Sequence, residues 1–309
     1  MKRFVVKLVL FALLFLAGIG GLMLLPLPSQ SYILAILDKY RSLETLESPK
    51  LVIAGGSNCA FGIDSEAISQ ALGMPVFNLG MNAGFGLGRI LEDAGSFLKE
   101  GDVLLLIPEY SHFTDAWNGG EAAYELIFTA RQYRLLLRPG LYGLPGNVQS
   151  YLVTHLQGFI AGFRPPNPLA YTRDGFNAYG DYTGHLEREN QAFQSQEALG
   201  PLDQEAVRRL CRFAAACEER GIQVLLSYPS YEEGSFAASR ELIHALDRTL
   251  REAPLGVISR PETYCFPRSF FYDTVYHLNR EGRQRRTKAL LQDLSRAGLR
   301  RSSSWERRH

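Results

Sequence analysis

In KLVIAGGSNCAFGIDS, which runs from Lys50 to Ser65, an apolar run stops at two glycines and a serine. The run, Leu51 to Ala54, is short and continuous, which is typical of a parallel strand buried on both faces. Gly55 and Gly56 tolerate unusual backbone angles and so favour a turn at its end. Ser57 is therefore expected at the carboxyl edge of a sheet, where open α/β sheets bind ligands. Gly-Gly-Ser is also ordinary turn chemistry, so this motif alone does not establish a nucleophile.

An acid and an imidazole follow more than two hundred residues later, in FYDTVYHLNREG from Phe271 to Gly282. A strand-end hydroxyl with Asp273 and His277 far downstream is the layout of an α/β serine esterase. In that mechanism His277 accepts the Ser57 proton, while Asp273 holds the useful imidazole tautomer and stabilises its protonated form. The alternative reading makes His277 an ordinary residue at the start of a helix that Asn279 caps.

The order of these motifs resembles the SGNH/GDSL hydrolase superfamily across roughly Lys50 to Leu291. Gly55 to Ser57 stand for the first block of that family, with Ser57 as its nucleophilic serine. NLGMNAG, Asn78 to Gly84, is similar to the second block, in which Gly80 is a backbone oxyanion donor beside the Ser57 N–H. Asp273 and His277 match the last block. The resemblance implies a flavodoxin-like, three-layer α/β/α sandwich that carries out ester chemistry.

Three departures from the family pattern bear on the site. Gly56 stands where the name-giving motif has Asp, a residue that is not the proton acceptor in the family's scheme. After the expected strand Val103 to Ile107 the chain continues PEYSHF, without the asparagine of the third block. Tyr110 and Asn82 are the candidates to replace this oxyanion donor, whose removal typically costs about 100- to 1000-fold in rate. Asp273 and His277 are four residues apart, whereas the common family spacing is three.

These departures are similar to those of membrane-anchored or periplasmic relatives, such as the alginate O-acetylation proteins and the teichoic-acid D-alanylation accessory esterase. The resemblance therefore implies an acyl esterase or O-acyltransferase, with acetyl as the expected acyl group, that acts on a cell-envelope or exported polysaccharide. The expected partners are an acylated glycan or another ester substrate, the membrane, and a membrane-bound acyltransferase. No cofactor and no metal are expected, since the cysteine spacing is not that of a zinc site. A formal net charge of +1 gives no electrostatic case for binding nucleic acid.

Leu8 to Leu25 are eighteen consecutive uncharged, mostly apolar residues, preceded by Lys2, Arg3 and Lys7. The run is near the lower limit for a membrane-spanning helix, and it is longer than the apolar core of a secretory signal. Because no small-x-small cleavage site follows, an uncleaved transmembrane anchor is favoured over a removed signal. The basic residues before the span place the N-terminus in the cytoplasm and the rest of the chain in the periplasm or outside the cell.

Beyond residue 28 the pattern alternates strands and helices, which predicts a mainly parallel sheet with helices on both faces. The chain divides into a cytoplasmic tip and anchor at 1–28, one α/β domain at 29–297 and a basic tail at 298–309. An insertion at about 139–200, rich in Pro, Gly, Asn and Tyr, is expected over the active edge of the sheet. The expected strands are 51–54, 76–79, 103–107, 222–227 and one near 257, and the expected helices are 64–72, 87–98, 121–137, 203–220, 235–252 and 279–297.

Several other readings stay open. The four cysteines either pair in an oxidising compartment or remain free, and Cys59 is either a small buried residue or a rival nucleophile. Aromatic side chains in the insertion and the site loops, among them Trp117 and Tyr179, fit either glycan binding or packing. The missing third-block asparagine and the anchor also fit a catalytically silent accessory protein that presents polymer to a membrane partner. Dinucleotide binding through GFGLG, Gly84 to Gly88, lacks the acidic residue that should follow.

Overall fold

The computed structural model describes residues 1–25, 29–129 and 171–299, together with residues 149, 152–153, 155–157 and 159–160. At the centre is a five-stranded parallel sheet with the strand order β2-β1-β3-β4-β6. These strands are β1 Leu51–Gly55, β2 Val76–Asn78, β3 Val103–Ile107, β4 Gln223–Leu226 and β6 Gly256–Val257. The expected α/β fold with a mainly parallel sheet is confirmed.

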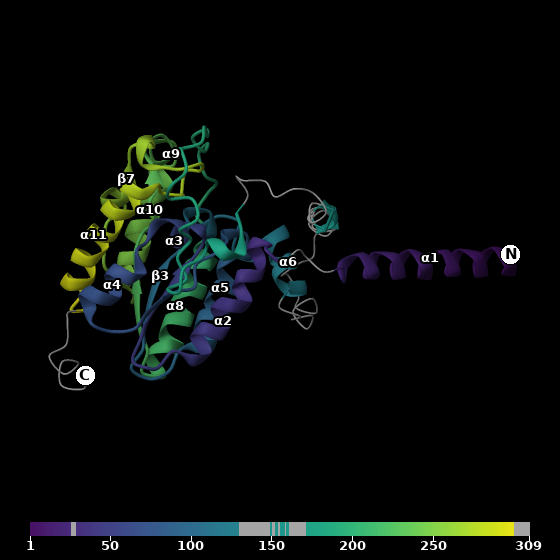
Figure 1. Ribbon diagram of the computed structural model, residues 1–309, viewed down its shortest axis with the longest axis horizontal. Coiled ribbons are helices and arrows are strands. Elements are labelled where there is room, and N and C mark those ends of the chain that lie inside the picture. Colours follow the sequence, from purple (N-terminus) through teal and green to yellow (C-terminus); the bar gives the residue numbers. More distant parts are fainter. Residues whose placement is uncertain are drawn as a thin grey trace.

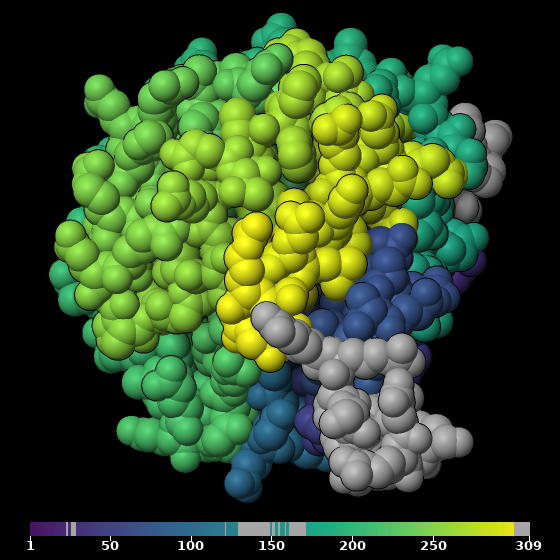
Figure 2. All heavy atoms as spheres, turned by 90° about the vertical axis from the view of Figure 1, so that its left-hand side faces the viewer, coloured from purple at the N-terminus to yellow at the C-terminus, as the bar shows by residue number. Residues whose placement is uncertain are grey.

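Alternate residues of each strand point to opposite faces of the sheet, and helices cover both faces. Val52 and Ala54 lie in the larger apolar core, covered by α2 Ala35–Thr45, α5 Leu87–Phe97, α8 Gln204–Glu219 and α10 Arg240–Glu252. Leu51 and Ile53 lie in a second core, covered by α3 Ser57–Gly62, α4 Ser65–Leu72 and α11 Arg280–Arg296. Figure 2 shows this second face, with α11 in yellow beside α4 in blue. Burial on both faces is the reason that the strand sequence is apolar without alternation.

Side-chain caps set two of the expected helix starts. The Asp64 carboxylate accepts the Ala67 N–H at 3.2 Å, and Gly73 ends α4 in the left-handed region at a φ of 63°. Asn279 caps α11 by accepting the Gly282 N–H at 3.0 Å. Each cap satisfies an N–H group that the first turn of a helix leaves without a partner. These boundaries are local properties of the sequence.

Other elements differ from the sequence-based expectation. The helix expected at 235–252 is two helices, α9 Glu233–Ala238 and α10, because the chain leaves helical geometry at Ser239 (φ −105°, ψ 13°). No sequence pattern predicted α2 or α3, and α3, with six residues, is too short to show a helical period. In the range 121–137 the structure describes α6 Glu121–Thr129, and the remainder lies outside the described residues.

Short elements complete the described chain. They are η1 Tyr32–Leu34, η2 Ala83–Phe85, η3 Tyr110–Phe113, η5 Arg173–Gly175, η6 Pro261–Tyr264, η7 Arg268–Phe270, and a separate parallel pair of strands, β5 Tyr231–Glu232 and β7 Cys265–Phe266. The described part of the expected insertion, 171–200, has little regular structure beyond η5 and isolated bridges, of which one joins Phe176 and Tyr182. Of the rest of the insertion, 139–170, the structure describes only residues 149, 152–153, 155–157 and 159–160.

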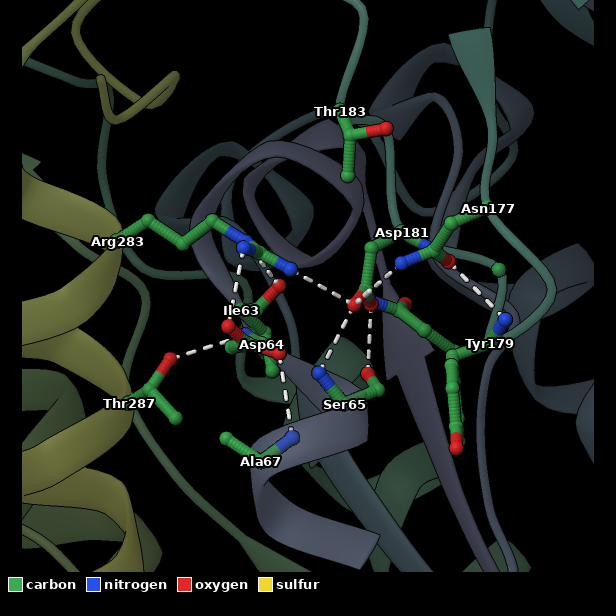
Figure 3. A network of polar contacts seen from close by, with 12 residues as sticks. Ile63, Asp64, Ser65, Ala67, Asn177, Tyr179, Asp181, Thr183, Arg283 and Thr287 are labelled. Carbon is green, nitrogen blue, oxygen red and sulfur yellow. Dashed lines mark hydrogen bonds and ion pairs between the residues drawn. The ribbon is translucent and has the colours of Figure 1, made fainter. Parts of the chain in front are cut away.

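Asp181 fastens this part of the insertion to the domain (Figure 3). Its buried carboxylate accepts hydrogen bonds from the Ser65 N–H and Oγ, from Asn78 Nδ2 and from Arg283, at 2.6–3.0 Å. Arg283 also forms an ion pair with Asp64. Residues of β2, α4 and α11 therefore meet the insertion at one carboxylate.

The N-terminal helix α1, Lys2–Met23, projects away from the domain in Figure 1. It is long and apolar enough to cross a bilayer, and none of its apolar window is buried against the rest of the chain. A membrane anchor and a signal sequence both have these properties.

Candidate active site

The strand order reverses direction between β1 and β3, at the carboxyl ends of these two strands. The chain leaves β1 for β2 on one side, while β3 lies on the other side, and open α/β sheets bind ligands at such a switch in strand order. Ser57 begins α3 two residues after β1 ends at Gly55, and Glu109 lies two residues after β3 ends at Ile107. The pairing of β1 with β3 therefore brings a hydroxyl and a carboxylate together.

Ser57 and Glu109 are in hydrogen-bond contact. Ser57 Oγ donates to Glu109 Oε1 at 3.3 Å, and the Asn58 N–H donates to the same oxygen at 3.2 Å. Glu109 is only 4% exposed. Sequence reasoning missed this residue, although a carboxylate directly after a buried apolar strand was a readable signal. It lies in the segment after Val103–Ile107, where an asparagine was expected.

Asp273 and His277 lie together, as their shared motif predicted. His277 Nδ1 lies 2.8 Å from Asp273 Oδ1, and Thr274 Oγ1 accepts the backbone N–H groups of Tyr276 and His277, which closes the turn between the pair. Burial raises the pKa of Asp273, but the hydrogen bond from His277 and its charge outweigh that effect and hold the pKa below its usual value. An ionised Asp273 that accepts from Nδ1 leaves Nε2 as the basic nitrogen.

Phe61 connects the histidine to the helix that carries the serine. Its ring lies parallel to the His277 imidazole, with 3.9 Å between centroids and 9° between planes. Phe61 is four residues after Ser57, so both lie on one face of α3. Within the described chain, the hydrogen bond of Ser57 Oγ goes to Glu109, and none joins Ser57 to His277.

Tyr171, from the insertion, adds a hydroxyl to this pair. Its hydroxyl donates a short hydrogen bond to Asp273 and lies 3.2 Å from His277 Nδ1. Its ring contacts Phe61 and Tyr32. Burial, followed by the Asp273 hydrogen bond and charge, raises the pKa of Tyr171, so this phenol stays protonated and remains a donor. The insertion therefore supplies part of the site.

Hydrogen bonds within the second block involve both of its expected oxyanion donors, Gly80 through its N–H and Asn82 through its acceptor oxygen. The Gly80 N–H donates to Asn78 Oδ1 at 3.0 Å, and Asn82 Oδ1 accepts the Gly84 N–H at 2.8 Å within its own turn. A Cβ at Gly80 would overlap the Cys59 side chain, so only glycine fits there. The Gly80 N–H becomes available to an oxyanion only if its hydrogen bond to Asn78 is replaced.

Lys39, from α2, also binds this segment. Its buried ammonium donates to the carbonyl oxygens of Asn78, Gly80 and Gly180, at 2.6–2.9 Å. Burial lowers the pKa of Lys39 to about 7, despite the nearby charge of Asp181. This lysine thereby joins α2, the second block and the insertion.

Tyr110, the other candidate for the missing donor, points into the core. Its ring packs against Tyr228 and Tyr231, and its hydroxyl is buried without a hydrogen-bond partner among the described residues. The Tyr110 N–H donates to the Tyr276 hydroxyl at 3.3 Å. The structure records no contact between this side chain and Ser57, and Glu109 is the residue of this loop that touches the serine.

His112 fixes the loop that carries Glu109. The Glu109 N–H donates to His112 Nδ1 at 3.1 Å, so Nδ1 is an acceptor and Nε2 carries the proton toward the Ala83 carbonyl, 3.0 Å away. Burial lowers the pKa of His112, which favours this neutral form. The backbone of Glu109 is therefore tied to the second block.

The four cysteines are unpaired. Cys59 is fully buried, and burial raises the pKa of its thiol, which fits a packing residue and not a nucleophile. In the described ranges, no group of three or more His, Cys, Asp or Glu side chains is arranged to hold a metal ion. In GFGLG, a Cβ at Gly86 would overlap the backbone at Asn118 and Gly119, so this glycine serves close packing of the chain against itself.

A surface hollow of about 210 Å³ lies beside Trp117. Gly88, Arg209 and Phe213 also line it, and the Arg209 guanidinium lies over the Trp117 ring at 5.4 Å. Ser57, Glu109 and His277 do not line this hollow.

Comparison with known protein families and with curated proteins gave no match to the chain.

Proposed function

We propose that the chain is a serine-dependent acyl esterase or O-acyltransferase with an SGNH-like sandwich fold. Ser57 is the nucleophile, His277 the general base and Asp273 its orienting carboxylate. The observation that carries the proposal is the 2.8 Å contact between His277 Nδ1 and Asp273, in an imidazole that stacks on the helix beginning with Ser57. The strand order and the order of the motifs along the chain add support.

In the proposed reaction, Ser57 Oγ attacks the acyl carbonyl carbon while its proton moves to His277 Nε2. Asp273 stabilises the imidazolium that forms. The protonated His277 then gives its proton to the leaving alkoxide, and the C–O bond of the substrate ester breaks. Water or a sugar hydroxyl next attacks the acyl-serine, with His277 again as base, and Ser57 regains its proton. Water as acceptor makes the protein an esterase, and a sugar hydroxyl makes it a transferase.

A cell-envelope polysaccharide is the proposed substrate, and α1 is the proposed anchor. With Lys2, Arg3 and Lys7 on the cytoplasmic side, the domain lies in the periplasm or outside the cell. Five peptide steps lead from Leu25 to Gln30 and span at most about 18 Å. The Gln30 carbonyl already accepts the Arg173 N–H at 3.0 Å, two residues from Tyr171 at the site. The short connection between α1 and the domain favours a substrate ester that lies at the membrane surface. A membrane-bound acyltransferase is the proposed partner there.

The first experiment uses the full chain, purified in detergent, with a fluorophosphonate probe and with p-nitrophenyl acetate. Wild type is compared with Ser57→Ala and His277→Ala. We expect labelling and turnover in wild type and loss of both in each variant, because one removes the nucleophile and the other its base. Equal labelling of wild type and Ser57→Ala would refute the proposal.

A catalytically silent accessory protein is the second candidate function. The observation that favours it is that Glu109 and Asn78 already occupy the Asn58 and Gly80 N–H groups beside Ser57. This candidate predicts that Ser57→Ala retains cellular function. Its proposed glycan contacts include Trp117, at the hollow described above, and Tyr179, in the insertion. Unchanged polysaccharide binding in Trp117→Ala and Tyr179→Ala would exclude these two contacts.

A further inference from the structure

One oxygen of Glu109, Oε1, accepts three hydrogen bonds from the first two residues of the helix that carries Ser57. Oε1 receives Ser57 Oγ at 3.3 Å, the Asn58 N–H at 3.2 Å and Asn58 Nδ2 at 3.4 Å. The carboxylate is buried, and within the described residues no Lys, Arg or His forms an ion pair with it. A buried charge without a cationic partner is costly, so its position beside the candidate nucleophile calls for a functional account.

Gly56 makes room for this contact. A Cβ at residue 56 would overlap the Glu109 carboxylate, and the backbone there (φ −81°, ψ −156°) is one that any residue adopts. Residue 56 is therefore limited to glycine by the space beside Glu109, and not by its backbone angles. Two departures from the family pattern, a glycine before the serine and a glutamate after β3, are in contact with each other in the fold.

We propose that Glu109 is a positioning residue that holds Ser57 in a resting state. Its carboxylate accepts the hydroxyl proton that His277 must take, and it occupies the Asn58 N–H beside the reacting oxygen. As the Ser57 Oγ–carbon bond forms, negative charge moves onto the acyl oxygen, and a carboxylate close to Ser57 opposes that charge. The acyl substrate must therefore displace Glu109 before the Ser57 proton passes to His277. This inference rests on the proposed function and adds how Ser57 is kept inactive before the substrate binds.

The test measures the second-order rate constant of fluorophosphonate labelling in the full chain. Glu109→Gln keeps the shape of the side chain and removes its charge. We expect labelling at least about ten-fold faster than wild type, because the carboxylate charge that opposes the developing oxyanion is gone. With p-nitrophenyl acetate, kcat should rise while KM stays near its wild-type value, because the change acts on the transition state.

Glu232→Gln is the matched control. Glu232 is also a buried carboxylate at a helix start, where it accepts the Ser235 N–H at 2.8 Å, but it begins α9 and not α3. Its substitution should leave the labelling rate unchanged. Gly56→Ala is the second variant, since the added methyl would overlap the Glu109 carboxylate, and also meet the Ala83 Cβ, without changing the charge of the carboxylate. Gly56→Ala should also be labelled faster than wild type, and it takes the place of Glu109→Gln in the test if that variant does not fold.

The outcomes separate this inference from the proposed function. Labelling of wild type that depends on Ser57, with Glu109→Gln and Gly56→Ala folded and no faster, overturns the resting-state role and leaves the enzyme standing. A rate that falls in Glu109→Gln shows that the carboxylate assists the reaction, and it overturns the inference as well. If wild type, Glu109→Gln and Gly56→Ala are all inert while folded, both proposals fail.

Discussion

The ring of Phe61 lies flat against the imidazole of His277, with centroids 3.9 Å apart. Phe61 belongs to the same short helix as Ser57, whereas His277 comes from a turn more than two hundred residues later. Because Phe61 is fully buried, its ring cannot turn away without disturbing the core. The stacking therefore fixes the plane of the imidazole relative to the helix that carries the serine.

Replacing Phe61 with Leu should impair activity more than stability. We expect about a 10- to 100-fold loss of labelling rate, because the imidazole is no longer held in one plane and small misplacements of catalytic groups are costly. The free energy of unfolding should fall by only about 1–2 kcal/mol. Labelling kinetics and urea unfolding measure the two effects. Phe236→Leu is the control, since Phe236 is buried against His244 elsewhere, and its labelling rate should not change.

The Asp273 carboxylate should make stability depend on pH in the acid range. Its pKa in the folded protein is held below the usual value, so it stabilises the fold above about pH 4, the unfolded value, and loses that contribution as pH falls through the folded pKa. The difference in unfolding free energy between wild type and Asp273→Asn should therefore shrink from pH 7 to pH 3. In Tyr171→Phe, which removes a hydrogen bond to Asp273, the folded pKa should lie nearer the unfolded value, so the total loss should be smaller and should be complete at a higher pH. Parallel pH curves for wild type and Asp273→Asn would contradict this account.

Removing the charge of Asp181 should strongly destabilise the domain. Asp181→Asn removes the buried one of the two carboxylates that pair with Arg283 and leaves Asp64 as its partner, so we expect a loss of up to about 3 kcal/mol, below the full cost of an unpaired buried charge. Urea unfolding measures the change. The control is Glu187→Gln, at an exposed ion pair with Arg280, which should leave the unfolding midpoint in place. A small effect of Asp181→Asn would mean that the insertion is held by other contacts.

Lys39 should make stability rise between about pH 7 and pH 10. Its pKa is about 7 in the folded protein, and the usual value near 10.4 applies to the unfolded chain. Between these values the unfolded chain binds more protons, so the free energy of unfolding increases with pH. The slope should be absent in Lys39→Met, and urea unfolding at pH 7, 8.5 and 10 compares the two proteins. Equal slopes would place the folded pKa of Lys39 near its usual value.

The sequence by itself determined the features that depend on neighbours in the chain. The apolar runs of β1 and β3, the Asp64 and Asn279 caps, the length of α1 and the pairing of Asp273 with His277 within one turn all arise from residues a few positions apart. Periodicity and capping report such short-range interactions directly.

Only the tertiary structure decided how the candidate site is assembled. Ser57 meets Glu109 because β1 and β3 are adjacent in the sheet, and strand order is not written in the local pattern of either strand. Tyr171 reaches His277 across 106 residues, and the Gly80 N–H is occupied by Asn78 through the geometry of its turn. These contacts depend on how whole elements pack, so their physical cause is the burial of both faces of the sheet and not any short motif.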